Sequence, residues 1–135
     1  MAATKAEQMR PPEPFILVPV LGNLATRYVA QGDLVRTVAV LERARPYETA
    51  PSVSQHRFRI PLLNAASEVH LQRGEASLAR QKAALAVRIM EKAENGDEAE
   101  RVGPLHQLAR AELDLGLFSA AERRWKQCLE ILQRR

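Results

Sequence analysis

The chain has 135 residues, of which 46% are apolar and 4% aromatic, and its formal charge is +4. This length suits one folded domain, and an apolar set rich in alanine and leucine favours packed helices over a sheet. No run of about 18 apolar residues occurs, so the sequence predicts no membrane-spanning segment. Basic and acidic residues are interspersed, and without a basic stripe we expect no nucleic-acid binding. The single cysteine, Cys128, excludes an internal disulfide and indicates a reducing, cytoplasmic setting.

The chain begins with a polar, proline-containing stretch. Residues 1–13 include the pair Pro11-Pro12, which favours extended geometry, so we expect a flexible N-terminal segment. Residues 14–135 should then form the folded domain. Its first predicted helix runs from Pro14 to about Gln31, because prolines are tolerated in an opening turn.

A tight turn follows at Gly32-Asp33, and the next predicted helix returns from Leu34 to about Arg45. Pro46 should end this helix or bend it sharply, because proline lacks the N–H that a helix interior uses. Tyr47 to Ser54 is then a connector between two hairpins.

The start of the third helix can be placed in two ways. Residues 52–55 have the form of a capping box, which favours one long helix, kinked near Pro61, that ends at Gly74. Alternatively, the helix begins at Pro61 and the preceding turn is separate. We favour the long helix, because no other helix breaker lies between His56 and Ile60.

Three further helices complete the prediction. One runs from Glu75 to about Glu94, and Asn95-Gly96-Asp97 is a strong turn signal. Asp97 should cap a helix that continues through Gly103-Pro104 to Leu115, and the last helix begins at Leu117. Six main helices result, arranged as three antiparallel hairpins.

Three turn glycines reveal an internal repeat. Gly32, Gly74 and Gly116 are separated by 42 residues each (74 − 32 and 116 − 74). A fixed period of this size is typical of stacked helical repeats. Aligning the repeats on these glycines brings equivalent residues together: Leu21, Leu63 and Leu105; Leu24, Ala66 and Leu108; Ala25, Ser67 and Ala109; Thr37, Ala79 and Ala121; Leu41, Ala83 and Trp125; Ala44, Ala86 and Cys128.

These aligned positions resemble the tetratricopeptide repeat (TPR), in the 42-residue form of kinesin light chains. The resemblance implies an all-α fold, an α-α superhelix of three antiparallel helix hairpins, with repeats at about 14–52, 53–96 and 97–135. It also implies a non-catalytic module for protein–protein interaction, which binds a peptide or a helix in its concave groove. One departure concerns the slot that prefers an aromatic residue, which holds Tyr28, His70 and Glu112. We therefore expect looser packing at that slot in the third repeat.

No catalytic constellation is visible in the sequence. The three histidines lie far apart and no pair has the spacing of a helical metal site, so we expect no metal and no cofactor. His70 should be a half-buried packing residue and His106 a solvent-facing one. Cys128 occupies a small-residue slot, which favours an inert buried thiol over a nucleophile. The sequence therefore predicts a protein that is not an enzyme.

In the related fold the first helix of each repeat lines a concave groove. The residues expected there are Gly22, Asn23, Thr26, Asn64, Ala65, Glu68, His106, Gln107 and Arg110. Amide side chains can pair with both the N–H and the C=O of a peptide backbone, which suits an extended ligand. Arg110 would favour an acidic or carboxylate-bearing ligand. The alternative is that these side chains are ordinary solvated surface groups.

The last helix carries an apolar stripe, Trp125, Leu129 and Leu132. Part of this stripe should face its own hairpin, which we expect for Leu129, while Trp125 should be partly uncovered. We therefore expect a homodimer or a contact with another protein at this end. Two functions remain beside peptide binding: a structural self-assembly unit, and a regulatory domain of a larger signalling or transcription protein.

Overall fold

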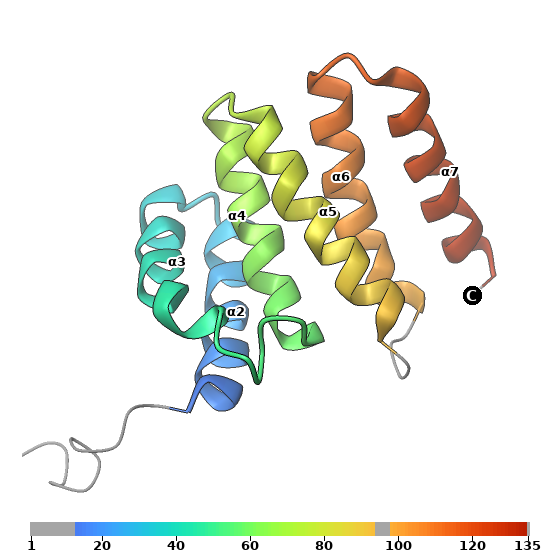
Figure 1. The fold of residues 1–135 in the computed structure, drawn as a ribbon. Coiled ribbons are helices and arrows are strands. Elements are labelled where there is room, and N and C mark those ends of the chain that lie inside the picture. The colour runs from blue at the N-terminus through green and yellow to red at the C-terminus, as the bar shows by residue number, and fades with distance from the viewer. Residues whose placement is uncertain (1–12, 94–97, 135) are drawn as a thin grey trace, which may run out of the picture.

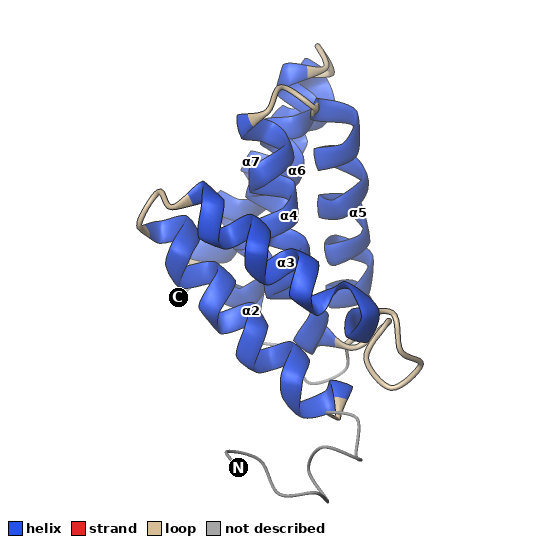
Figure 2. Ribbon diagram, turned by 90° about the vertical axis from the view of Figure 1, so that its left-hand side faces the viewer, coloured by secondary structure: helices blue, strands red, loops and turns tan. Residues whose placement is uncertain are grey.

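The structure is a computed structural model that describes residues 13–93 and 98–134. Its elements are α2 (Pro14–Ala30), α3 (Leu34–Glu48), η1 (Arg57–Arg59), α4 (Ile60–Gln72), α5 (Ala76–Lys92), η2 (Glu98–Arg101), α6 (Val102–Asp114) and α7 (Phe118–Gln133). The six α-helices of the described residues form three consecutive hairpins, as the sequence predicts (Figure 1). In the side view the first hairpin is slanted relative to α5 (Figure 2). Among the described residues no helix is long and apolar enough to cross a membrane.

Some sequence predictions concern residues outside the described ranges. These are the flexible segment up to residue 12, the turn at Asn95-Gly96-Asp97 and the cap at Asp97. They stay predictions.

The three hairpin turns share one backbone conformation. Gly32, Gly74 and Gly116 have φ values of 71°, 75° and 80°, a left-handed region that side chains resist. In each turn the residue after the glycine donates its N–H to the carbonyl five positions earlier, at 2.8 to 2.9 Å. This bond pairs a carbonyl that the end of the helix leaves without a partner. The same turn structure therefore recurs every 42 residues.

The second helix does not stop at Pro46. Helix α3 continues to Glu48, with Pro46 exposed in its last turn. At that position the missing N–H removes only one helical hydrogen bond, to the exposed residue Glu42, and water can replace it.

The long third helix predicted from residue 52 onward is wrong, and the alternative start near Pro61 is confirmed. Residues 51–55 form turns, and His56 is extended with φ −94° and ψ 145°. The His56 ring accepts a hydrogen bond from the N–H of Phe58 at 3.1 Å, which caps η1 instead of extending a helix. The connector is anchored by Val53, which is fully buried, and by Arg59, which donates to Glu48 at 2.9 Å.

The repeat-defining slots form the core. Leu21, Leu63 and Leu105 are 3%, 1% and 5% exposed. The small-residue slots are also buried, and they hold Ala25, Ser67, Ala109, Thr37, Ala79, Ala121, Ala44, Ala86 and Cys128. Small residues at these positions let neighbouring helix axes approach closely. Leu24 is the exception in its slot, because it lies on the outer side of the first helix and is 37% exposed.

Gly22 marks the closest approach between the first two hairpins. A Cβ added at Gly22 would lie 3.0 Å from Cβ of Pro61, so the glycine lets α2 pack against α4. Gly22 is therefore buried between helices and does not line a groove. Ala65, which we also expected to line the groove, is only 3% exposed.

Candidate functional site

The predicted groove residues lie on α2, α4 and α6, the first helices of the three hairpins. Asn23, Thr26 and His106 are exposed, whereas Asn64, Glu68, Gln107 and Arg110 are half-buried. Two of the exposed residues make contacts within the chain that limit their use in binding: the Thr26 hydroxyl donates to the carbonyl of Gly22 at 2.9 Å, and Nδ1 of His106 accepts from Nε1 of Trp125 at 3.0 Å.

The half-buried residues Glu68, Gln107 and Arg110 form one network across α4 and α6. The Arg110 guanidinium donates to both oxygens of the Glu68 carboxylate, from Nη1 to Oε1 and from Nη2 to Oε2, the latter at 3.4 Å. Gln107 donates to Oε1 at 3.0 Å, and Gln72 donates to Oε2 at 2.8 Å. Glu68 and Arg110 are 42 residues apart, so the network joins the same slot of consecutive repeats.

The network controls the ionisation of Glu68. Burial by itself raises the pKa of this carboxyl, but hydrogen bonds from Arg110, Gln107 and Gln72 outweigh it and lower the pKa to about 2. Glu68 is therefore a carboxylate throughout the neutral range. Arg110 already has an acidic partner within the chain, so it offers less of its charge to a ligand than the sequence suggests.

Glu68→Gln should destabilise the fold by about 1–3 kcal/mol at pH 7, because it removes charge-assisted hydrogen bonds. The folded pKa of Glu68 lies below the ordinary value of 4.5. Its contribution is therefore present above about pH 4.5 and is lost as the pH falls towards 2. Urea unfolding measures the free energy of unfolding of Glu68→Gln and of wild type at pH 7 and pH 3. The difference between the two proteins should be large at pH 7 and much smaller at pH 3. The exposed Glu122→Gln is the control and should change stability little; a Glu68→Gln effect that is equal at both pH values would contradict this account.

Asn64 is the half-buried residue that the network leaves out. Its Oδ1 atom is buried and has no hydrogen-bond partner among the described residues. Its Nδ2 atom faces Gly103, where an added Cβ would lie 3.4 Å away. A buried amide oxygen without a donor costs free energy, and a ligand N–H would remove that cost once the amide turns towards it.

The other titratable residues behave mainly as packing groups. His70 is half-buried, as predicted, and its Nδ1 lies 3.0 Å from Oε1 of Glu75. Cys128 is 6% exposed, and burial raises the pKa of its thiol, which favours the inert protonated form. No group of three potential ligand side chains that could hold a metal ion occurs in the described part of the chain.

The expectation of looser packing at Glu112 is wrong. Its side chain is fully buried, and its carboxylate accepts from Nε and Nη2 of Arg124 at 3.3 and 3.5 Å. A charged pair between α6 and α7 thus fills the slot that an aromatic residue fills elsewhere. The Arg124 side chain is 30% exposed, which leaves its charge partly solvated.

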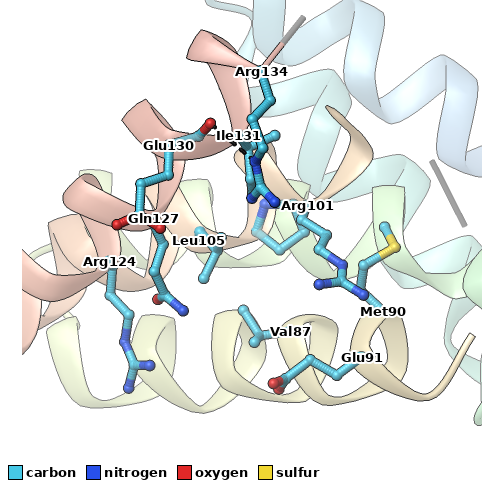
Figure 3. Close-up of a pocket in the computed structure, with 11 residues that line it drawn as sticks. Val87, Met90, Glu91, Arg101, Leu105, Arg124, Gln127, Glu130, Ile131 and Arg134 are labelled. Carbon is cyan, nitrogen blue, oxygen red and sulfur yellow. Dashed lines mark hydrogen bonds between the residues drawn. The ribbon is translucent and has the colours of Figure 1, made fainter. Parts of the chain in front are cut away.

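A hollow that sequence reasoning missed lies between α5 and α7. A pocket of about 120 Å³ there has α6 residues beneath it and contains Val87, Leu105 and Ile131 among its apolar lining (Figure 3). Arg101, Arg124 and Arg134 line the same pocket together with Glu91 and Glu130. A second, wider hollow continues along α5 and shares Arg124 with the first. The depth of these hollows depends on the spacing between helices. The 42-residue period is the one sequence feature that bears on that spacing.

Comparison with known proteins decides the fold. No family model matches the sequence, and no curated protein matches it either. A solved structure does match: a kinesin-light-chain-like protein of Podospora anserina with nearly identical TPR-like repeats, at a TM-score of 0.69 and 22% identity. The chain has a tetratricopeptide-like repeat fold. The match covers 90% of this chain and 57% of the length of the other.

The TPR-like fold confirms the resemblance predicted from the repeated slots. Stacked hairpins of this kind present extended surfaces. The network of Glu68 and the amide of Asn64 lie on α4 and α6, the first helices of the second and third hairpins.

Proposed function

We propose that this chain is a non-catalytic scaffold module that binds an extended peptide of a partner protein across α2, α4 and α6. The observation that carries the proposal is the unpaired amide oxygen of Asn64 on a half-buried side chain. Beside it, the bonds from Arg110 and Gln107 hold the Glu68 carboxylate in place. A fixed polar network beside an amide that can turn its unsatisfied oxygen towards a ligand suits the N–H groups of an extended backbone.

The charges on this surface refine the ligand class. The Arg110 side chain is 34% exposed, and its pairing with Glu68 neutralises most of its field. We therefore expect backbone recognition with a weak preference for acidic side chains. Sequence-tolerant binding of this kind is compatible with service as a regulatory domain within a larger signalling protein.

Asn64→Ala is the variant that separates binding from folding. It should weaken a bound peptide by about 1–3 kcal/mol, roughly 5- to 150-fold in Kd. Folding stability should stay within about 0.5 kcal/mol, because the side chain that is removed carries an unsatisfied oxygen. Peptides selected from a random display library against the wild-type chain are the probe, and fluorescence anisotropy gives their Kd.

The matched control is Gln81→Ala, which truncates an exposed amide on α5 beside the wider hollow. Loss of affinity in Asn64→Ala with none in Gln81→Ala supports the proposal. If only Gln81→Ala loses affinity, the ligand lies between α5 and α7 and the proposed site is wrong. A library that yields no peptide above background would also count against the function.

A further inference from the structure

The outer face of α7 carries apolar side chains at positions that the middle repeat keeps covered. Leu129 lies 42 residues after Val87, which packs against the buried cluster of Leu105, Cys128 and Ile131 from the next hairpin. Leu129 itself is 56% exposed and Leu132 is 48% exposed, so the expectation that Leu129 faces its own hairpin is wrong. Helix α7 thus presents the surface that α5 uses to receive a following hairpin.

The outer face of α2 shows the complementary pattern. Val20 and Leu24 lie 84 residues before Pro104 and Leu108 of α6, which pack close to α5 and are almost fully buried. Val20 is 57% exposed and Leu24 is 37% exposed, and Ile16, one turn earlier, is 63% exposed. Helix α2 thus presents the surface that α6 turns towards a preceding hairpin.

We propose that copies of this chain associate head to tail, with α2 of one copy packed on α7 of the next. The packing of α6 on α5 within the chain is the prototype of this contact. The outer face of α7 is equivalent to that of α5, the outer face of α2 is equivalent to that of α6, and both are exposed. Contacts between different faces of identical chains are heterologous and build open arrays or rings, not closed pairs. The expected association therefore continues beyond a dimer.

Charge complements the apolar match. Arg80 of α5 and Glu112 of α6 line one hollow in the prototype contact. The equivalent of Arg80 in α7 is Glu122, and the equivalent of Glu112 in α2 is Tyr28, next to Arg27. Head-to-tail packing therefore places the exposed Arg27 near the exposed Glu122, whose carboxylate also pairs with Lys126 of its own helix at 2.9 Å.

Sedimentation velocity of two single variants and of their mixture tests this contact. Leu129→Glu removes the α7 face, and Val20→Glu removes the α2 face. The wild-type mass should rise with concentration beyond a dimer between about 1 and 100 µM, where contacts of micromolar Kd are populated. Each variant alone should stay monomeric. Their equimolar mixture should form a dimer and stop there, because each variant supplies the face that the other lacks.

Val35→Glu is the control, since Val35 is 82% exposed on α3 and lies outside both faces. This variant should associate like wild type. Circular dichroism checks that each variant folds, and Leu132→Glu with Ile16→Glu is the replacement pair should one of the first pair unfold. A wild-type chain that stays monomeric at the highest concentration overturns the proposal. So does a Val20→Glu variant that dimerises alone, because that result requires a symmetric contact through α7.

Discussion

Arg124→Met should destabilise the fold by about 3 kcal/mol, because it leaves the carboxylate of Glu112 buried without its cation. The Glu112 side chain is fully buried and accepts hydrogen bonds only from Arg124 among the described residues. The methylenes of Arg124 are retained by methionine, so the change isolates the lost charge. Urea unfolding at pH 7 measures the effect.

Two further variants separate the ion pair from the packing. The neighbouring Arg123→Met removes an exposed arginine and should shift stability by less than about 0.5 kcal/mol. The double variant Glu112→Leu with Arg124→Met should recover most of the loss, because no unpaired charge then remains. An Arg124→Met protein as stable as wild type would mean that water reaches Glu112 and that the pair contributes nothing.

Leu63→Ala and Leu108→Ala should each cost about 2–5 kcal/mol, the range for truncating a buried leucine. Leu63 is 1% exposed and packs with Ile60, Ala86, Ile89 and Met90, while Leu108 is 3% exposed. Leu78→Ala is the matched control, since Leu78 is 41% exposed on α5, and it should cost less than about 1 kcal/mol. Chemical denaturation that places Leu63→Ala within about 0.5 kcal/mol of wild type would show that the repeat register is wrong.

The sequence was most informative where one residue type has one physical role. Gly32, Gly74 and Gly116 all adopt positive φ, and their spacing alone places the three hairpins. The buried leucine and alanine slots follow from that register. The connector from Tyr47 to Ser54 was predicted, but the capping-box pattern at residues 52–55 wrongly favoured a continuous helix after it. The deciding contact is the bond from Phe58 N–H to the His56 ring. That contact depends on a side-chain rotamer, which a pattern does not encode.

Polar residues were placed correctly on their helices, but their partners were not predicted. From the sequence alone, Glu112 is poorly suited to a buried slot. In the structure Arg124, on the facing helix, pairs with it. Glu68 and Arg110 occupy the same slot in consecutive repeats, so the register itself could have predicted their contact. We instead assigned both to a ligand. Pairing between repeats is therefore the first thing to test before polar residues on such a face are assigned to binding.

Mapping a bound peptide by NMR tests most directly whether it lies on the first helices of the hairpins. A selected peptide is titrated into the isotope-labelled chain, and the shift of each backbone amide is recorded. We expect the largest shifts around Asn64 on α4 and Gln107 on α6. Largest shifts along α3 or α5 instead, near Arg36, Arg43 or Arg80, would contradict it.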